Sequence, residues 1–191
     1  MNSDSNRPMA ILLAAGSARR YGADKLTQPL PNGEWIAVRA CRNLLAAVGR
    51  VFAVVRPDSS LTSPLRELGA EVAEFEDADE GMGASLAFGV AASLPAAGWI
   101  VALADMPWIT PDTISIVMND LKAHGGIVAP TYQSRRGHPV AFAREFGHEL
   151  ANLTGDRGAR SVIEAHLDRL RLLECQDPGV LRDIDTPADL A

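Results

Sequence analysis

Cysteine, lysine, aromatic residues and long hydrophobic runs are all scarce in this 191-residue chain. The two cysteines, Cys41 and Cys175, form no CxxC pair, which excludes a disulfide framework and a cysteine-based zinc site. The apolar run over residues 9–15 is too short to span a membrane and is typical of a buried parallel strand. A net charge of -6 argues against general binding of nucleic acids or anionic membranes. We therefore expect a cytoplasmic protein with no membrane or nucleic-acid partner.

The length and the 47% hydrophobic content favour a single globular domain. We expect that domain over residues 9–191, preceded by a polar, disordered tail over residues 1–8. Lysine occurs only at Lys25 and Lys122, while every other basic residue apart from histidine is arginine. Chance is one explanation for Lys25. The other is that its position requires a compact, flexible ammonium rather than a planar guanidinium.

Short apolar runs alternate with helical patterns along the chain. The runs predict strands over residues 9–14, 51–55, 71–74, 99–103, 126–129, 140–142 and 170–174. The helical patterns cover residues 36–48, 62–68, 83–94, 111–123 and 158–167. Thr110 and Pro111 suit the start of one helix, Asp156 or Gly155 is expected to cap the last, and Asn32-Gly33 predicts a hairpin turn. This alternation indicates a mostly parallel sheet covered on both faces.

The loop after the first expected strand combines small residues with cations. Its sequence continues from Leu13 through Ala14, Ala15, Gly16 and Ser17 to Arg19, Arg20 and Lys25. Small residues let backbone N–H groups approach phosphate oxygens, and the cations neutralise the phosphate charge. The spacing matches neither a Walker A motif nor a dinucleotide-binding G-x-G-x-x-G motif. The loop therefore indicates a polyphosphate site, with a glycine turn and solvated arginines as the alternative.

Two aspartates are candidate metal ligands. Asp105 directly follows a buried strand, at the sheet edge where open parallel sheets bind ligands. Mg²⁺ prefers a few carboxylates together with phosphate oxygens and water, so Asp105 suits that ion. Asp185, in the segment over residues 183–190, is the second candidate. The alternatives are a turn before Pro107 for Asp105, and helix capping by Asp185 or Thr186 for the later segment.

Three glycine-containing segments are further candidates for ligand contacts. Residues 80–89 place glycines and Ser85 at the start of a helix, where N–H groups and a hydroxyl are available to a ligand. A glycine-rich start to the helix, without any ligand, is the alternative. The loops over residues 136–140 and 154–160 can line a substrate cleft. His138, in the first of these loops, is either functional or simply exposed.

Taken together and in order, these segments resemble the MobA-like nucleotidyltransferases. Residues 13–25 are similar to the signature L-A-A-G-x-S-x-R-M-G-x-x-K of that family. Five further segments, residues 81–86, 104–107, 137–139, 154–160 and 183–190, resemble other motifs of that family. In the same order, these motifs are G-M-S-S-S-L, G-D-Q-P, G-N-P or G-H-P, T-G-D-x-G-A-R and D-I-D-T-P-x-D-L. Within the superfamily the chain is most similar to the molybdenum cofactor cytidylyltransferases.

The resemblance implies a three-layer α/β/α sandwich with a mostly parallel sheet, the Rossmann-like fold of nucleotidyltransferases and nucleotide-diphospho-sugar transferases. It implies transfer of CMP from CTP, or of a nucleotide from another NTP, to the terminal phosphate of a phosphorylated pterin, the molybdenum cofactor. It further implies Mg²⁺ as cofactor and a molybdoenzyme or its chaperone as a partner. The implied catalytic residues are Lys25, Arg20 and Asp105, and the implied metal ligands are Asp105 and Asp185. The implied nucleotide-binding residues are Leu13, Ala14, Ala15, Gly16, Ser17, Arg20, Lys25 and Ser85.

Some family positions differ in this chain. Gly83 and Ala84 replace two serines, and Ala104 and Met106 replace the glycine and glutamine of the G-D-Q-P segment. These changes leave two alternatives to a cytidylyltransferase open. One is the same chemistry with GTP, or with a sugar or alditol phosphate as acceptor. The other is a nucleotide-binding protein without turnover that delivers a cofactor.

Overall fold

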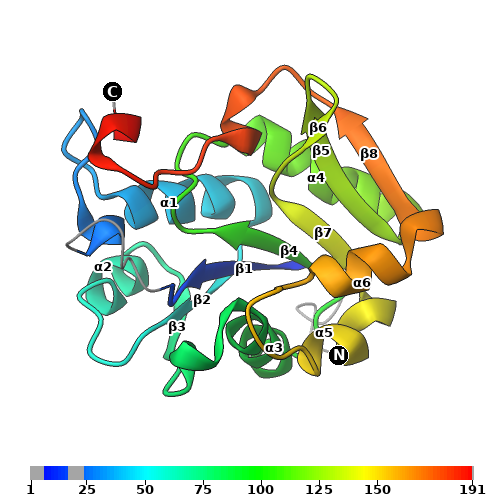
Figure 1. The fold of residues 1–191 in the computed structure, drawn as a ribbon, viewed down its shortest axis with the longest axis horizontal. Helices are drawn as coiled ribbons and strands as arrows, with labels where there is room; N and C mark the ends of the chain where they lie inside the picture. The colour runs from blue at the N-terminus through cyan, green and yellow to red at the C-terminus, as the bar shows by residue number, and fades with distance from the viewer. Residues whose placement is uncertain (1–6, 17–23, 191) are drawn as a thin grey trace.

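The computed structural model describes residues 7–16 and 24–190. Their central feature is an eight-stranded sheet in the order β3-β2-β1-β4-β7-β5-β6, with β8 paired to β5 (Figure 1). The strands are β1 Met9–Ala14, β2 Val51–Val55, β3 Glu71–Glu74, β4 Gly98–Leu103, β5 Ile127–Tyr132, β6 Arg135–Arg136, β7 Val140–Ala143 and β8 Leu170–Glu174. Strand β7 runs antiparallel to β4 and β5, whereas β3, β2, β1 and β4 are mutually parallel. The predicted mostly parallel sheet is confirmed.

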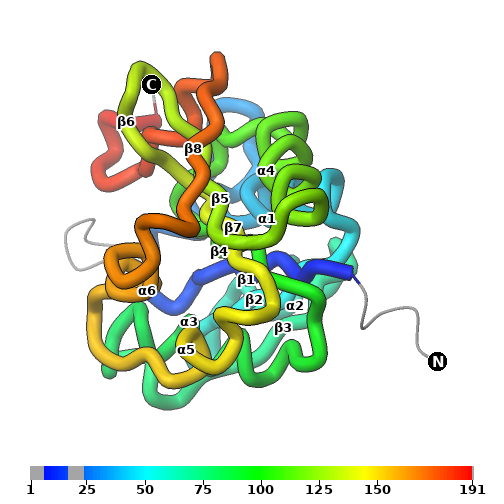
Figure 2. Tube along the Cα trace, turned by 90° about the vertical axis from the view of Figure 1, so that its right-hand side faces the viewer, coloured from blue at the N-terminus to red at the C-terminus, as the bar shows by residue number. Residues whose placement is uncertain are grey.

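Helices cover both faces of this sheet. The α-helices are α1 Ile36–Val48, α2 Thr62–Glu67, α3 Met82–Ala92, α4 Pro111–His124, α5 Gly147–Ala151 and α6 Arg160–Ala165. Short 3₁₀ segments include η2 Lys25–Thr27, η6 Pro178–Leu181 and η7 Pro187–Leu190. Figures 1 and 2 show α1 and α4 on one side of the sheet and α3, α5 and α6 on the other. None of the described helices is both long enough and apolar enough to cross a membrane.

The alternation of side chains along β1 explains the two layers of helices. Ala10, Leu12 and Ala14 pack into one hydrophobic core with α1 and α4. Met9, Ile11 and Leu13 point to the opposite face and pack with α3, α5 and α6. Because β1 is buried on both faces, its sequence is continuously apolar rather than alternating. The three-layer α/β/α architecture expected from the sequence is therefore confirmed.

Most elements lie where the sequence predicts them, but two local expectations change. Helix α6 begins only at Arg160, and no side chain caps its start, so the predicted capping by Asp156 or Gly155 is wrong. The Asn32-Gly33 turn is present, with Gly33 at φ +82°, but its flanks form only a single bridge between Pro29 and Trp35. The flanks cannot extend into strands because η2 precedes them and α1 begins immediately afterwards.

The predicted N-terminal tail falls partly outside the described residues. Residues 1–6 are not described, whereas Pro8 is buried and the Arg7 carbonyl accepts a hydrogen bond from the Ala97 N–H at 3.2 Å. The boundary of the domain after residue 8 stays a prediction.

Cys41 and Cys175 are both free thiols, as their spacing predicts. Burial raises the pKa of Cys41 to about 12, so this thiol stays protonated.

The contact between β4 and β7 requires a glycine at position 98. A Cβ there would lie 2.7 Å from the Phe142 carbonyl oxygen and 3.2 Å from Leu121. We expect Gly98→Ala to lower the free energy of unfolding by about 1–3 kcal/mol, as overpacking of a close-packed interior does. Urea unfolding followed by circular dichroism measures this change. An unchanged unfolding midpoint would contradict the tight β4–β7 contact.

Candidate functional site

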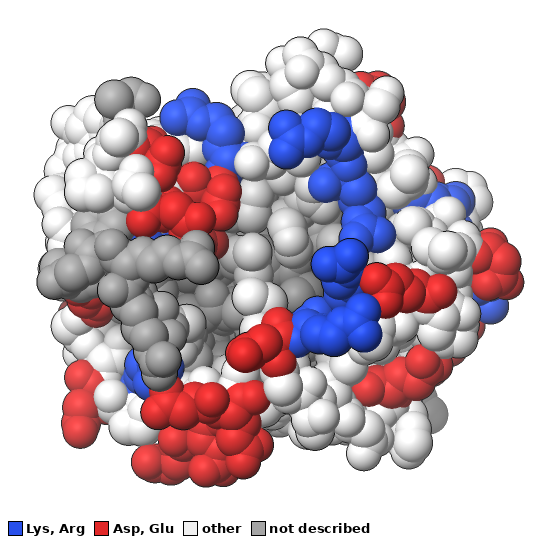
Figure 3. Space-filling model, viewed as in Figure 1, with Lys and Arg blue, Asp and Glu red and all other residues white. Residues whose placement is uncertain are grey.

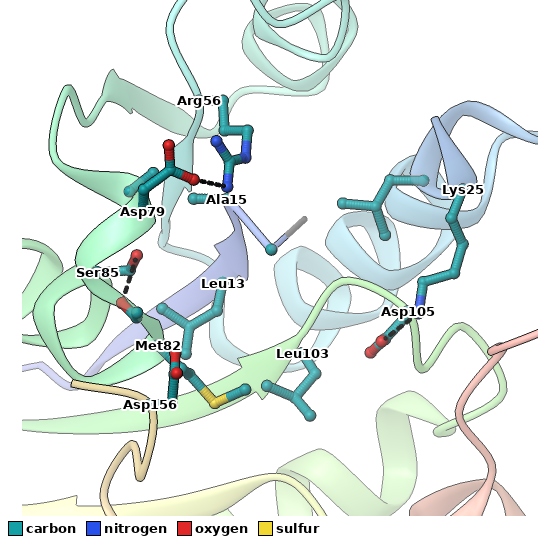
Figure 4. Close-up of a pocket in the computed structure, with 14 residues that line it drawn as sticks. Leu13, Ala15, Lys25, Arg56, Asp79, Met82, Ser85, Leu103, Asp105 and Asp156 are labelled. Atoms are coloured by element: carbon teal, nitrogen blue, oxygen red, sulfur yellow. Dashed lines mark hydrogen bonds and ion pairs between the residues drawn. The ribbon is translucent and has the colours of Figure 1, made fainter. Parts of the chain in front are cut away.

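A cavity of about 500 Å³ opens at the carboxyl ends of β1 and β4 (Figure 4). Leu13 lies opposite Leu103 in the parallel register, and its carbonyl accepts a hydrogen bond from the Ala104 N–H at 3.1 Å. Parallel strands end at the same edge of a sheet, so the loops that follow β1 and β4 meet there. Six predicted site residues line this cavity: Leu13, Ala15, Gly16, Lys25, Ser85 and Asp105.

Lys25 connects the two candidate metal ligands. Its Nζ lies 2.9 Å from Asp105 Oδ2 and 3.2 Å from Asp185 Oδ1. The Lys25 side chain is 13% exposed, against 55% for that of Asp185. Burial alone lowers the pKa of Lys25, but the hydrogen bonds and charges of the two aspartates outweigh this effect and raise it. Lys25 is therefore charged at neutral pH; it lines the cavity together with Asp105, whereas Asp185 is outside the described lining.

The chain after η6 brings Asp185 to Asp105. Ile184 is fully buried, and its N–H donates to the Asp105 carbonyl at 3.0 Å. The alternative of helix capping by Asp185 or Thr186 stays a prediction; the side-chain acceptor described at this turn is Asp189, within η7. Its Oδ2 accepts hydrogen bonds from the backbone N–H groups of Thr186 and Asp185 and from the Thr186 hydroxyl. The hydrogen bonds from Thr186 contribute most to lowering the pKa of Asp189. Asp185 is thereby left to face Lys25.

The two aspartates suit a hard divalent cation. Asp105 Oδ1 is buried and has no hydrogen-bond partner within the described residues. Mg²⁺ and Mn²⁺ favour carboxylate oxygens and complete their coordination with phosphate oxygens and water. No group of three or more His, Cys, Asp or Glu side chains with the geometry to hold a metal occurs in residues 7–16 and 24–190. A metal at Asp105 and Asp185 would therefore depend on ligands supplied by a substrate.

The wall of the cavity opposite Lys25 holds polar residues that the sequence motifs did not identify (Figure 4). Arg56 Nη2 lies 2.8 Å from Asp79 Oδ1, and both side chains line the cavity (Figure 4). The missed signal was the position of Arg56 directly after β2, which ends at the same edge as β1. Ser85 lies on the same side of the cavity as Asp79 (Figure 4), and its hydroxyl donates to the Gly81 carbonyl at 3.2 Å. The Ser85 oxygen still has lone pairs available to accept a hydrogen bond.

The start of α3 is packed directly against the loop over residues 154–158. The Gly83 N–H donates to the Gly155 carbonyl at 2.6 Å. A Cβ at position 83 would lie 2.7 Å from the carbonyl oxygens of both Gly155 and Thr154. This close approach leaves no room for a side chain at position 83, where the family motif has a serine. It also places Asp156 on the wall of the cavity.

The remaining predicted residues lie in three places. Ala14 lines a neighbouring cavity of about 400 Å³, which shares Gly16 with the first. Ser17 and Arg20 lie outside the described residues, so their predicted roles stay predictions. His138 lines a further cavity of about 250 Å³. Its Nδ1 is buried without a hydrogen-bond partner in the described part of the chain, so His138 is not simply exposed.

Comparison with known proteins identifies similar sequences and folds. The family described as "MobA-like NTP transferase domain" matches residues 10–170. PucB, a purine catabolism protein of Bacillus subtilis, is 29% identical over 95% of this chain and 93% of its own length. A probable molybdenum cofactor guanylyltransferase of Mycobacterium ulcerans is 29% identical over 98% of this chain and 94% of its own length.

The solved structure of Rv0371c from Mycobacterium tuberculosis has a similar fold. It superposes with a TM-score of 0.78 at 26% identity and covers 96% of this chain and 95% of its own. Its complex with manganese superposes with a TM-score of 0.75 at 25% identity, with the same coverage. A metal-bound structure thus exists among the proteins that this chain resembles.

Substitution of Gly83 tests the contact between α3 and the loop over residues 154–158. We expect both Gly83→Ala and Gly83→Ser to lower the free energy of unfolding by about 1–3 kcal/mol, because the Cβ itself overlaps the carbonyl groups. Urea denaturation measures the change, and Ala91→Ser on the exposed side of the same helix is the control, with an expected effect within about 0.5 kcal/mol. A Gly83→Ser protein as stable as the control would refute the close approach.

Substitution of Lys25 tests whether its ammonium competes with a divalent cation for the two aspartates. We expect Lys25→Met to bind Mn²⁺ roughly tenfold more tightly in the absence of nucleotide, because two carboxylates then face each other without a cation. The loss of free Mn²⁺ signal in electron paramagnetic resonance measures the affinity. Lys122→Met, which changes the other, exposed lysine, is the control. Equal affinities in wild type and Lys25→Met would argue against competition.

Proposed function

The chain belongs to the MobA-like NTP transferase family, and we propose that it transfers CMP from CTP to the terminal phosphate of molybdopterin with release of pyrophosphate. The observation that carries this proposal is the position of Lys25, which lines the cavity, between Asp105 and Asp185. An ammonium next to two carboxylates can hold a triphosphate together with the metal ion that accompanies it. The resemblance to the molybdenum cofactor cytidylyltransferases suggests the nucleotide and the acceptor.

The proposed binding mode follows the two walls of the cavity. The triphosphate lies beside Lys25, with backbone N–H groups of the loop after β1 contacting its oxygens. Arg20 and Ser17 contribute further contacts to the same phosphates. Asp105 and Asp185 hold Mg²⁺, which when bound polarises the phosphates and neutralises their charge. The base and ribose then extend toward Arg56, Asp79 and Ser85 on the far wall.

The proposed reaction is a single displacement at phosphorus. An oxygen of the acceptor phosphate attacks the α-phosphorus of CTP, and the bond to the pyrophosphate oxygen breaks. Both reactants are anions, so the protein has to offset their repulsion and align them, which Lys25 and the loop N–H groups do. The acceptor phosphate is already ionised at neutral pH, so the step needs neither a general base nor a covalent nucleophile.

GTP is the second candidate nucleotide, because a relative with 29% identity is named as a guanylyltransferase. The polar groups of Arg56 and Asp79 are suited to reading the edge of a base by hydrogen bonds. Gly83 leaves no hydroxyl at a position where the family motif has a serine. We therefore propose that residues on the far wall of the cavity, where this chain departs from the family motif, select between cytosine and guanine.

Pyrophosphate release with CTP, GTP, ATP and UTP, each with and without molybdopterin and with Mg²⁺ or Mn²⁺, tests this proposal. We expect turnover with CTP only when molybdopterin is present. We also expect Asp105→Asn to lower kcat by about 10²-fold or more, the scale of losing one preorganised charge-stabilising group. The control is Asp168→Asn, which changes an exposed aspartate outside the cavity.

Each outcome of this panel has a distinct meaning. Preference for GTP would replace the cytidylyl assignment by a guanylyl one. Turnover with a sugar or alditol phosphate instead of molybdopterin would overturn the acceptor. Binding of CTP with no pyrophosphate from any acceptor would favour a cofactor-delivery protein without turnover.

A further inference from the structure

The carboxylate of Asp177, directly before η6, has no part in the proposed reaction. Its Oδ2 accepts hydrogen bonds from the Thr110 N–H at 2.9 Å, the Thr110 hydroxyl at 2.9 Å and the Thr113 hydroxyl at 2.8 Å. Its Oδ1 accepts one from the Gly179 N–H at 2.9 Å. One side chain thus connects the start of α4 to residues 177–185, which we call the C-terminal segment.

The start of α4 is also the end of the loop that carries Asp105. This loop, residues 104–110, joins β4 to α4. Its second half is held from α1, where Asn43 Nδ2 donates to the carbonyls of Pro107 at 3.0 Å and Ile109 at 2.9 Å. The loop is therefore fixed to both neighbouring helices, and a group bonded to its end is bonded to the element that carries Asp105.

The C-terminal segment runs along this loop in the reverse direction. Gly179 packs so closely against Trp108 that a Cβ on Gly179 would overlap the Trp108 carbonyl. Further along, the Arg182 guanidinium lies 5.2 Å from the centroid of the Trp108 ring, and the Ile184 N–H donates to the Asp105 carbonyl at 3.0 Å. The bonds of Asp177 to α4 stand at one end of this series of contacts, and the bond to Asp105 stands at the other.

Electrostatic repulsion opposes the last of these contacts. The C-terminal segment carries the exposed carboxylates of Asp183 and Asp185, and Figure 3 shows acidic side chains gathered over this part of the chain, beside the hollowed centre. Repulsion between Asp185 and Asp105 is offset in part by Lys25, which contacts both. Contacts away from these charges have to supply the rest, and those of Asp177 lie there.

We infer that Asp177 is a positioning residue for the pair of Asp105 and Asp185. Its hydrogen bonds fix the C-terminal segment to the loop, so that Asp185 meets Lys25 and Asp105 in one arrangement. The inference rests on the proposed function, in which the two aspartates hold a divalent cation. Ligands of a metal commonly depend on outer groups that orient them in this way.

A simpler role for Asp177 is stabilisation of the first turn of α4. That turn already has a cap of its own, because the Thr110 hydroxyl accepts a hydrogen bond from the Thr113 N–H at 3.4 Å. Asp177 comes from 67 residues further along the chain, and its second oxygen bonds to Gly179 in η6 rather than to α4. The arrangement thus joins two segments and does more than cap one helix.

Amide hydrogen exchange of the full chain, followed by NMR without metal or nucleotide, tests the inference. We expect Asp177→Ala to speed exchange of the Ile184 N–H about tenfold or more relative to that of Leu12 in β1, the effect of losing hydrogen bonds to a charged group. Asp120→Ala is the matched control. Asp120 lies near the other end of α4 and accepts hydrogen bonds from Arg171 on β8 at 2.6 Å and 2.8 Å. Its loss is expected to leave the ratio of the two exchange rates unchanged.

Thr113→Val is a second variant that keeps Asp177 and its bond to Gly179. It removes a hydroxyl that donates to Asp177 and changes nothing in the C-terminal segment. We expect it to speed the exchange of Ile184 relative to Leu12 as well, to a smaller extent. An unchanged ratio in this variant would overturn the inference, whether or not Asp177→Ala folds.

The affinity for Mn²⁺, measured by electron paramagnetic resonance, tests the consequence for the metal ligands. We expect Asp177→Ala to weaken binding about tenfold, the scale for a group that orients a metal ligand. In an Asp185→Asn background the same change is expected to have an effect within about twofold, because the segment then has no ligand to orient. Equal weakening in both backgrounds would overturn the positioning role.

These measurements separate the two proposals. Faster exchange of Ile184 in Asp177→Ala, with no binding of Mn²⁺ by the wild type, would support the positioning of the C-terminal segment by Asp177 and contradict the proposed metal site. Transfer of CMP at a normal rate and KM by Asp177→Ala, with unchanged affinity for Mn²⁺, would support the proposed function and overturn the inference.

Discussion

The parallel pairing of β1 with β4 determines where the rest of the site lies. Leu13 and Leu103 are in register, and the chain leaves both strands at the same edge. The loop after β1 and the loop carrying Asp105 must therefore meet, and the C-terminal segment joins them through the hydrogen bond from Ile184 to Asp105. Three stretches far apart in sequence thus bring Lys25, Asp105 and Asp185 together. The charges in the site depend on hydrophobic packing that fixes the strands.

The sequence predicted the fold well because β1, β2 and α1 have strong patterns. Their residues are apolar with the period of a buried strand or of a helix, and the structure begins and ends them where those patterns do. Local polar patterns were less reliable. Asp156 resembled a helix cap, but its carboxylate lies near Gly81, a contact between distant segments that sequence spacing does not encode.

The candidate site was predictable only where a motif marked it. Lys25 and Asp105 belong to recognisable segments, and they do lie together. Arg56 and Asp79 belong to no such segment, so their pairing became visible only with the tertiary structure. The same holds for three arginines that line one cavity: Arg136 on β6, Arg157 in the turn before α6, and Arg160 at the start of α6. The spacing of such residues in the sequence does not predict that they lie close together, because their proximity depends on how β7 pairs with β4.

The antiparallel insertion of β7 has a consequence for how such a protein changes over time. The cavity that holds Lys25 and Asp105 is lined by strand ends of the parallel half of the sheet. The cavity that holds His138 is lined in part by the segment that precedes the antiparallel strand β7. Leu13, Met82 and Leu103 belong to both. Substitutions at distant, independent positions act additively, whereas shared contacts couple their effects. Residues that line only one cavity can therefore change while the other cavity is retained. A substitution at one of these three shared apolar residues would affect both cavities.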